Sequence, residues 1–388
     1  MEHRQTPAGN HTEPPIDQRP PLSAPSISLP KGGGAIRGIG EKFAANPVTG
    51  TGSMSVPIAT SPGRSGFGPQ LSLSYDSGSG NGPFGFGWSL SLPAITRKTD
   101  RGLPQYQDAE ESDVFILSGI EDLVPILEKK GEQWERETVP PRTVDSETYS
   151  IQRYRPRLEG LFARIERWTN QTKPEETFWR SISKDNITTW YGRTANSRIA
   201  DPTDDTRIFS WLMCESYDDK GNVIVYHYKA ENSDSIDQAQ AHERNRTDDT
   251  RKANQYLKQI YYGNRTPYFP ELKENNAWPE PPSPGAPDGT PNWLFEVVFD
   301  YEDGHYAEEA PDFDERVFAW PTLSPPANAE WPPRIDPFSS YRAGFEIRTY
   351  RLCQQVLMFH HFPTELGTSD YLVRSTDFTY SYENRVVP

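Results

Sequence analysis

The sequence has few cysteines, few apolar residues and no excess of positive charge. Its 388 residues include only two cysteines, Cys214 and Cys353, and no Cys-x-x-Cys pair or Cys/His cluster. This pattern excludes a disulfide framework and argues against a structural zinc site. Both cysteines stand in apolar or aromatic runs, so we expect buried free thiols in a protein that folds in a reducing cytoplasm.

Basic patches and long hydrophobic runs are also missing. The formal net charge is −15, whereas a nucleic-acid binder needs a basic face to neutralise phosphates. We therefore expect no nucleic-acid partner. No run is apolar and long enough to span a bilayer, and residues 1–21 lack the apolar core of a Sec signal peptide. The protein is thus expected to be made in the cytoplasm and to leave the cell, if it does, by lysis, a dedicated machine or a partner.

The apolar content is low for the length of the chain. Hydrophobic residues make up 34%, yet 10 Trp, 19 Tyr and 18 Phe are too many aromatic residues for a disordered protein. The length exceeds that of one compact core, which predicts two or three subdomains or an open layered structure. A sheet with one wet face, or a thin wall wetted on both sides, would reconcile these observations.

Local patterning predicts an all-β fold with mainly antiparallel layered sheets, hairpins, long Pro-rich loops and little helix. Residues 1–26 are polar and Pro-rich, and we expect a disordered leader. Residues 27–388 are predicted to form one β-rich domain, because short β-prone runs alternate there with turn residues. In the run 70–78, for example, Leu71, Leu73 and Tyr75 alternate with polar residues, which places them on one face of a strand.

Further runs are predicted to form strands or hairpins. In the run 207–232, Asp218 to Asn222 supplies the turn of a hairpin. Trp179, Trp190 and Trp211 are expected to anchor sheet faces. Hairpins are also expected in 149–160, 161–168 and 177–192. Strands are expected over 53–60, 88–97, 293–304, 344–362 and 376–383.

Three stretches interrupt the strand pattern and are predicted to be flexible insertions. Residues 231–252 are charged and predict a mobile insertion or a short surface helix. Residues 264–292 and 307–340 are rich in Pro, which removes ladder hydrogen bonds.

One segment alternates glycine with large aromatic side chains: Gly82, Phe84, Gly85, Phe86, Gly87 and Trp88. Glycine allows positive φ and close backbone approach, and the aromatic residues bury surface that glycine cannot. We interpret this structural signature as a tight corner between strand layers, pinned by its three aromatic side chains.

The segment from Leu29 to Tyr106 resembles the first part of the SpvB-type N-terminal domain, which is shared with the B components of insecticidal toxin complexes. It reads LPKGGGAIRGIGEKFAANPVTGTGSMSVPIATSPGRSGFGPQLSLSYDSGSGNGPFGFGWSLSLPAITRKTDRGLPQY. Later segments follow the same family's order, including WLMCESYDDKGNVIVYHYKAEN and DPFSSYRAGFEIRTYRLCQQVLMFHHFP. The first of these is also similar to one hairpin of RHS/YD-repeat proteins.

The resemblance implies a non-catalytic module of a hollow β-shell that encloses and helps deliver a cytotoxic polypeptide. The implied partners are an RHS-repeat toxin C-component and a pore-forming A-component, and the implied location is extracellular, as part of a toxin assembly. Loops bearing Trp278, Trp320 and Trp331 are expected to be exposed and to pack against the rest of the shell. Two alternatives stay open: a carbohydrate- or receptor-binding β-module, and the leader domain of an ADP-ribosylating toxin whose catalytic domain lies outside this chain.

The sequence predicts no catalytic, cofactor or metal site. Glu135-Arg136-Glu137 spells the Glu-x-Glu of an ADP-ribosyltransferase, but Ser375-Thr376-Asp377 is not Ser-Thr-Ser and follows it in the wrong order. A solvated charged turn is the simpler interpretation.

Other short patterns are also interpreted structurally. The glycine runs 31–34 and 78–82 do not end in Gly-Lys-Ser/Thr, and residues 63–66 miss the spacing of a nucleophile elbow. His360 and His361 would face opposite sides of a strand, which predicts one packed and one exposed imidazole. We therefore expect no cofactor.

Overall fold

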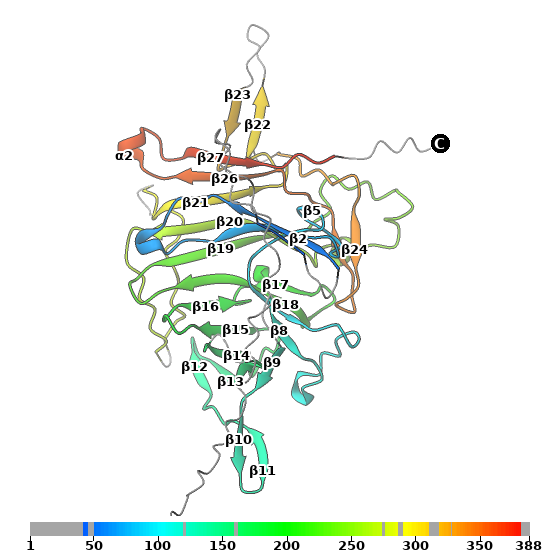
Figure 1. The fold of residues 1–388 in the computed structure, drawn as a ribbon, viewed down its shortest axis with the longest axis vertical. Coiled ribbons are helices and arrows are strands. Elements are labelled where there is room, and N and C mark those ends of the chain that lie inside the picture. Colours follow the sequence, from blue (N-terminus) through cyan, green and yellow to red (C-terminus); the bar gives the residue numbers. More distant parts are fainter. Residues whose placement is uncertain are drawn as a thin grey trace, which may run out of the picture.

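Antiparallel strands make up nearly all of the regular structure (Figure 1). The computed structural model describes residues 42–45, 50–118, 122–158, 162–273, 276–285, 290–309, 318–326 and 328–381. The predicted all-β fold with little helix is confirmed, whereas the predicted leader, residues 1–26, lies outside the described residues.

Eight strands of the main sheet form a closed ring. Their order is β16-β15-β14-β13-β9-β8-β7-β18, and a further pairing between β16 and β18 closes the circle. The strands are β7 (Ala94–Arg97), β8 (Phe115–Leu117), β9 (Asp122–Pro125), β13 (Glu147–Pro156), β14 (Arg164–Asn170), β15 (Thr177–Ile182), β16 (Thr188–Tyr191) and β18 (Asp204–Tyr217). Two short strands extend it: β12 (Arg142–Val144) pairs with β13, and β17 (Arg198–Asp201) pairs with β18.

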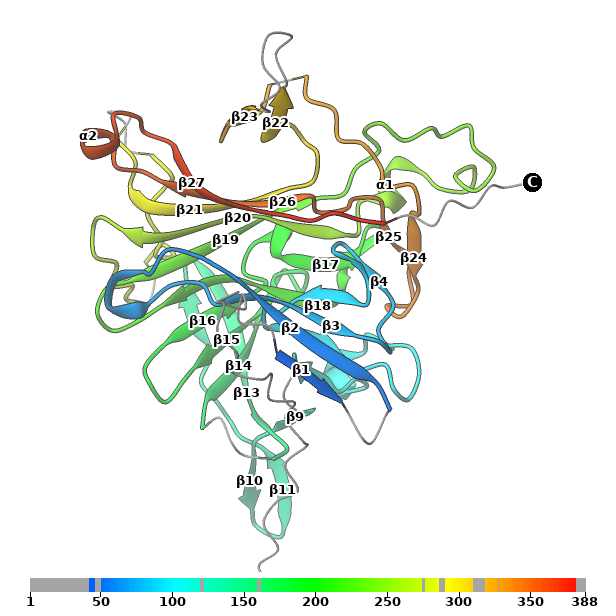
Figure 2. The same cartoon turned by 45° about the horizontal axis from the view of Figure 1, so that its top comes forward.

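An open sheet continues from the same long strand. Residues Glu215–Tyr217 of β18 pair with β19, while Ser210–Leu212 pair with β7, so β18 belongs to both the ring and the open sheet. The open sheet runs on through β19 (Val223–Ala230), β20 (Gln255–Asn264), β21 (Trp293–Asp300), β26 (Gln355–His360) and β27 (Tyr371–Asp377). Figure 2 shows it stacked above the ring.

Smaller elements decorate this frame. A four-stranded sheet with the order β1 (Lys42–Ala45), β2 (Gly52–Ile58), β3 (Leu71–Asp76), β6 (Trp88–Leu90) crosses the open sheet (Figures 1 and 2). The hairpins are β4 (Asn81–Gly82) with β5 (Gly85–Phe86), β10 (Leu127–Lys130) with β11 (Gln133–Arg136), β22 (Tyr306–Glu309) with β23 (Phe318–Pro321), and β24 (Phe338–Ser340) with β25 (Ile347–Thr349).

The described helices are short. They are α1 (Asp248–Arg251), α2 (Pro363–Leu366) and three 3-10 turns, Arg64–Gly66, Asp108–Glu110 and Ala195–Ser197. In the described part of the chain, no helix has the length and apolar character needed to cross a membrane.

Aromatic side chains fill the ring. Trp179 of β15 lies 5.0 Å from Phe115 of β8 and 4.9 Å from Tyr154 of β13, measured between ring centroids, and Trp211 of β18 lies 5.7 Å from Phe115. These strands are not neighbours in the ring, so their side chains meet across its interior. An eight-stranded closed sheet is just wide enough to be filled in this way.

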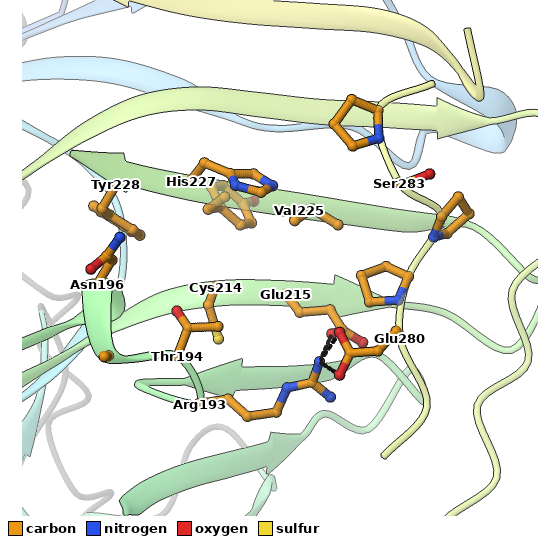
Figure 3. Close-up of a pocket in the computed structure, with 15 residues that line it drawn as sticks. Arg193, Thr194, Asn196, Cys214, Glu215, Val225, His227, Tyr228, Glu280 and Ser283 are labelled. Atoms are coloured by element: carbon orange, nitrogen blue, oxygen red, sulfur yellow. Dashed lines mark hydrogen bonds and ion pairs between the residues drawn. The ribbon is translucent and has the colours of Figure 1, made fainter. Parts of the chain in front are cut away.

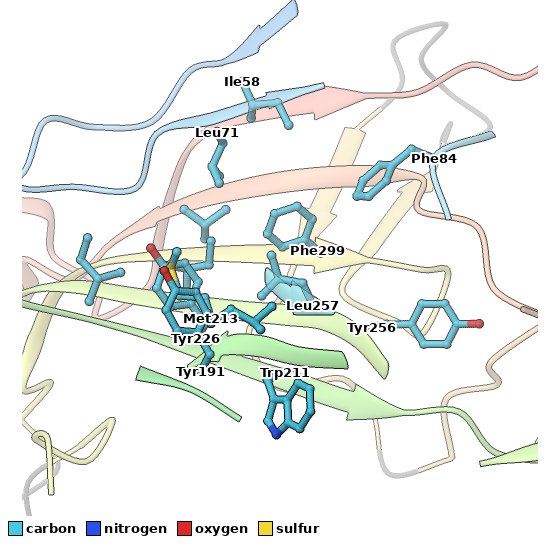
Figure 4. Close-up of a cluster of buried hydrophobic side chains, with 14 of the residues drawn as sticks. Ile58, Leu71, Phe84, Tyr191, Trp211, Met213, Tyr226, Tyr256, Leu257 and Phe299 are labelled. Atoms are coloured by element: carbon cyan, nitrogen blue, oxygen red, sulfur yellow. The ribbon is translucent and has the colours of Figure 1, made fainter. Parts of the chain in front are cut away.

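The same core continues between the ring, the open sheet and the four-stranded sheet of β1, β2, β3 and β6, which we call the N-terminal sheet (Figure 4). On β3, Leu71 and Leu73 are buried, as the alternation in the sequence predicts, and they contribute to this core with Ile58 of β2. Because one core serves all three layers, the predicted subdomains are joined rather than separate.

A second aromatic cluster lies on the outer face of the ring. Phe178 and Trp179 are consecutive residues of β15, so their side chains point to opposite faces. Trp179 enters the ring, and Phe178 packs outside with Trp168 and Trp190. The predicted anchoring of sheet faces by Trp179, Trp190 and Trp211 is confirmed by their exposures of 0%, 2% and 0%.

The predicted hairpin in the run 207–232 is also confirmed. Asp218 accepts hydrogen bonds from the backbone N–H groups of Lys220 and Asn222, both at 2.9 Å, and Gly221 has a φ of 82°. A side-chain acceptor that satisfies the turn amides, together with a glycine at positive φ, fixes the reversal between β18 and β19.

Two strand predictions near the C-terminal end are wrong in their extent. The strand expected over 376–383 is β27, which begins at Tyr371 and ends at Asp377. The run 344–362 contains two strands, β25 and β26, instead of one. Arg351 lies between them and is fully buried, with its guanidinium paired to Glu231.

The charged segment 231–252 is not confined to the surface as its composition suggests. Glu231, Glu243 and Arg251 are each only 1% exposed, and α1 is a single turn. Buried ion pairs hold the segment against the body of the protein. Its flexibility, like that of 264–292 and 307–340, stays a prediction.

Candidate functional site

The glycine-aromatic signature forms a tight corner at one end of the open sheet. Gly85 has a φ of 93° and Gly87 a φ of 80°, conformations that side chains disfavour. A Cβ atom built at Gly87 would lie 2.5 Å from Cε2 of Tyr75, and one built at Gly82 would lie 3.0 Å from the carbonyl oxygen of Trp88. Glycine is required at Gly87 for both conformation and space.

The aromatic residues of the signature have different environments. Phe84 is buried and makes edge-on ring contacts with Phe299 at 6.4 Å and Phe378 at 6.1 Å. Trp88 is half-buried and packs against the core and Tyr75. Phe86 is 66% exposed, so the expectation that it pins the corner is wrong. Its two-residue strand turns its side chain to solvent while Gly85 faces inward.

This corner contacts segments far along the chain. The backbone N–H of Cys353 donates to the carbonyl of Pro83 at 2.8 Å, and Arg334 donates to the carbonyl of Gly82 at 2.8 Å. Tyr380 donates to the carbonyl of Cys353 at 2.5 Å and lies against Gly85. The signature therefore fastens the last described residues to the N-terminal sheet.

A cavity of about 600 Å³ opens where β18 and β19 diverge (Figure 3). Its walls come from β18, β19, the turn Thr194–Asn196 and the proline-rich stretch Glu280–Pro284. At its edge Arg193 pairs with Glu215 at 3.3 Å and with Glu280 at 3.2 Å. Tyr268 donates to the other oxygen of Glu215 at 3.1 Å.

The electrostatics of this cavity do not activate a nucleophile. Burial raises the pKa of the Glu215 carboxyl to about 6, although Arg193 opposes the shift. Burial also raises the pKa of the Cys214 thiol, which donates to the carbonyl of Trp190 at 3.4 Å. A protonated, hydrogen-bonded thiol is a poor nucleophile.

The sequence patterns weighed for catalysis are not brought together. Glu135 is exposed on the β10–β11 hairpin, and Glu137 accepts from Arg153 at 2.9 Å. Ser375-Thr376-Asp377 lies on β27, at the opposite end of the molecule (Figures 1 and 2). Ser65 lies on an exposed turn with a φ of 56°. The glycine run 31–34 lies outside the described residues, and 78–82 leads into β4.

The histidine pair has separate structural roles. His361 is buried between the carboxylate of Glu296 at 3.2 Å and the carbonyl of Ser369 at 2.8 Å. His360 is half-buried and hydrogen-bonded to the Ser61 hydroxyl at 2.6 Å, so the expectation that the second imidazole is exposed is wrong. Within the described ranges, no three His, Cys, Asp or Glu side chains are grouped so that they could hold a metal ion.

Both thiols are buried and free, as predicted. The predicted exposed tryptophans are placed differently. Trp331 is 2% exposed, with the guanidinium of Arg351 4.2 Å from its ring centroid, and Trp278 is half-buried against the outer aromatic cluster. The expectation for these two is wrong, since each Pro-rich loop folds back on the body. Trp320 lies on β23, and its side chain is outside the described residues.

Sequence patterns gave no sign of the buried charged clusters. Glu231 pairs with Arg351 at 2.8 Å, and both side chains are completely buried. Asp303 accepts from Lys258 at 2.5 Å and from Lys229 at 2.8 Å. These partners lie 45 to 120 residues apart in sequence, so only the fold brings them together.

The fold and the signature have clear counterparts. The sequence profile of the family described as Salmonella virulence plasmid 65kDa B protein, SpvB, matches residues 46–362. This chain belongs to the SpvB family. The resemblance seen in the sequence is thereby confirmed.

Relatives of this SpvB-family chain include the mono(ADP-ribosyl)transferase SpvB of Salmonella choleraesuis strain SC-B67. It is 37% identical over 353 residues, which cover 89% of this chain and 52% of the relative. The SpvB of Salmonella dublin is 37% identical over 352 residues, with the same coverage. The chain thus spans about half the length of the curated relatives it matches.

Solved structures share the SpvB-family fold. The N-terminal domain of the effector SpvB from Salmonella typhimurium strain LT2 matches with a TM-score of 0.65 and 33% identity, over 84% of this chain and 100% of that one. A TcdB2-TccC3 structure matches with a TM-score of 0.68 and 33% identity, over 91% of this chain and 16% of that one. The Photorhabdus luminescens Tc holotoxin pore matches with a TM-score of 0.67 and 32% identity, over 94% and 16%.

Proposed function

We propose that this chain is a non-catalytic structural module of a toxin of the SpvB and toxin-complex B type. In this proposal it forms part of the wall of a hollow β-shell that encloses and helps deliver a cytotoxic polypeptide. The observation that carries the proposal is that one fold serves both as a whole N-terminal domain of SpvB and as 16% of a TcdB2-TccC3 chain.

The open sheet offers a place to continue such a wall. β27 pairs with β26 on one side, and among the described strands it is the last in the sheet order. Tyr371 and Val373 of β27 are 46% and 40% exposed. An exposed edge strand is a template for another strand, so we infer that β27 meets the rest of the shell.

A non-catalytic role fits the chemistry of the described residues. The cavity at Arg193 and Glu215 holds a protonated thiol and a paired carboxylate, and the Glu-x-Glu lies on a projecting hairpin. The curated relatives named as transferases extend over about twice the matched length. We therefore assign their transferase activity to the part that this chain does not match.

The proposed partners are an RHS-repeat C-component and a pore-forming A-component. The similar solved structures are those of TcdB2-TccC3 and of a Tc holotoxin pore. In this proposal the protein is made in the bacterial cytoplasm and acts outside the cell within the toxin assembly.

The test is co-expression with the protein encoded immediately downstream, followed by size-exclusion chromatography and electron microscopy. A co-eluting hollow particle is expected. Val373→Lys should weaken its formation, because a charge on an edge strand blocks further pairing. Val114→Lys is the matched control, since Val114 is 42% exposed but lies beside the ring. A stable monomer that does not bind the co-expressed protein would contradict the proposed role in a shell.

A second function is the leader domain of an ADP-ribosylating toxin. It is favoured by the complete coverage of the solved SpvB N-terminal domain and by the names of the curated relatives. The sequence that follows in the full-length gene discriminates the two. RHS repeats favour the shell, and a proline tract followed by Arg, Ser-Thr-Ser and Glu-x-Glu motifs favours the leader.

A carbohydrate- or receptor-binding role gains no support. It calls for a row of solvent-facing aromatic residues on one rigid sheet. The exposed aromatic residues among the described ones are scattered over separate elements: Phe86, Trp134, Phe162, Phe269, Tyr341 and Tyr371. A glycan array with specific hits would revive this alternative.

A further inference from the structure

The loop between β20 and β21 carries a strap, Asn276–Pro284, that lies over the outer face of the ring. Its Trp278 enters a group of four aromatic rings, with centroid separations of 5.5 to 6.0 Å. This aromatic cage consists of Tyr149, Trp168, Phe178 and Trp190. An indole held by several edge-on contacts is bound with defined geometry.

Polar contacts fix the strap next to the cage. Arg193 donates to the carbonyl of Pro279 at 3.2 Å and to both carboxylate oxygens of Glu280 at 3.2 Å. The single hydroxyl proton of Tyr268 is shared between Glu215 at 3.1 Å and the same Pro279 carbonyl at 3.2 Å. The backbone N–H of Asp145 donates to the carbonyl of Asn276 at 2.7 Å. The strap is therefore recognised through tryptophan, the following proline carbonyl and the next acidic residue.

Cavities border the strap and its approach. The cavity of about 600 Å³ adjoins Glu280–Pro284, and one of about 350 Å³ adjoins Trp278 and Glu280. A third, of about 250 Å³, adjoins Leu272. These hollows open to solvent beside the strap, which is seated through Trp278 and its polar contacts.

Release of residues 276–280 of the strap would leave the polar groups that bind them satisfied, while Ser283 stays in place to accept from the buried Trp293 indole at 3.1 Å. Arg193 would keep its ion pair with Glu215 at 3.3 Å, and Tyr268 would keep its hydrogen bond to Glu215 at 3.1 Å. Asp145 is exposed, so water would satisfy its backbone N–H. The usual penalty for an orphaned buried polar group is therefore avoided. What remains uncovered is the aromatic cage itself.

We propose that the aromatic cage is a docking site for an extended segment of a partner protein that carries tryptophan, proline and an acidic residue in succession. The strap occupies this site when the partner is absent. The cage would receive the indole, Arg193 the carbonyl and the carboxylate, and the 600 Å³ cavity the residues that follow. The strap shows by its own contacts which chemistry the site selects.

The test uses the whole chain and a synthetic peptide with the strap sequence Asn-Ala-Trp-Pro-Glu-Pro-Pro-Ser-Pro. Trp278→Ala empties the cage, and we expect this variant to bind the peptide saturably and at least ten-fold more tightly than the same peptide with alanine in place of tryptophan. Trp134→Ala is the matched control, because Trp134 is 65% exposed on the β10–β11 hairpin. It should bind the peptide no better than the unaltered protein.

A folded Trp278→Ala variant that binds neither peptide, or binds both equally, would overturn the proposal. If that variant does not fold, hydrogen exchange on the unaltered protein decides the matter. The strap amides at Ala277, Trp278 and Glu280 should exchange at least ten-fold faster than those of β20 and β21. Equal exchange rates would mean that the strap opens only when the protein unfolds, which excludes a replaceable occupant.

Discussion

At the residue scale, the most informative side chains are charged and buried. Glu231 and Arg351 are completely buried and joined at 2.8 Å, and the hydroxyl of Tyr256 donates to Glu231 at 2.5 Å. Removing either charge would strand the other in a medium that solvates it poorly. Nothing in the local sequence marks Glu231 as different from the exposed acidic residues around it.

Arg351→Met should lower the free energy of unfolding by about 3–5 kcal/mol, because it leaves Glu231 buried without its partner. The double variant Glu231→Gln/Arg351→Met should recover most of that loss. Urea unfolding followed by fluorescence measures both. Asp249→Asn, which removes an exposed pair with Lys252 at 2.9 Å, is the control and should have no measurable effect. An equal loss in the single and double variants would show that packing, not charge, is responsible.

Asp300 should make stability depend on pH. Burial, together with a hydrogen bond to Asp303, raises the pKa of its carboxyl to about 7, while Lys258 opposes the shift. Because the folded pKa exceeds the unfolded one, the favourable contribution is complete below about pH 4 and is lost as pH rises through 7.

Asp300→Asn should flatten this decline in the free energy of unfolding between pH 4 and pH 8, since the amide cannot ionise. Asp219→Asn, at an exposed turn position, should leave the decline unchanged. Chemical denaturation at a series of pH values provides the measurement. Parallel pH profiles for the Asp300 variant and the unaltered protein would refute the assignment.

At the element scale, the need for glycine in the corner formed by the glycine-aromatic signature can be tested by adding one methyl group. Gly87→Ala places a Cβ atom 2.5 Å from Tyr75 at a φ of 80°, so we expect a loss of about 1–3 kcal/mol in unfolding free energy. Gly80→Ala, with no atom within 4 Å of its Cβ position, is the matched control. Calorimetry of the two variants gives the comparison, and similar midpoints would indicate that the corner relaxes freely.

The sequence predicts elements better than it predicts what they contact. The alternation around Leu71 and Leu73 and the turn at Asp218 depend only on residues close in sequence, so both can be predicted from the sequence. Phe86 and Trp331 show that burial is harder to predict. Phe86 is exposed and Trp331 is buried, although both lie in glycine- or proline-rich segments. Their burial depends on segments far away in sequence.

At the scale of the whole molecule, ring closure is the feature that composition and periodicity do not reveal. It depends on a pairing between β16 and β18 and on β18 being shared with the open sheet. The position of the candidate site depends on this shared strand, since the 600 Å³ cavity opens where β18 of the ring and β19 of the open sheet diverge. Family resemblance indicated the module, but not where its cavity lies.

The shared strand predicts cooperative unfolding of ring and open sheet. Cys214 lies on β18 and Cys353 lies just before β26, and burial raises the pKa of both thiols. Neither should react with a thiol reagent in the native state, and both should become reactive at the same urea concentration. Single Cys214→Ser and Cys353→Ser variants assign the signal. Two separate midpoints would mean that the sheets unfold independently.

The filled interior of the ring also limits what can travel through this protein. Trp179, Trp211 and Phe115 occupy the space that a wider circle of strands would leave to solvent. An unfolded polypeptide cannot thread this circle without expelling its core. If the chain forms part of a hollow shell, its filled ring closes that part of the wall. Any enclosed polypeptide must then leave through an opening formed by other parts of the shell.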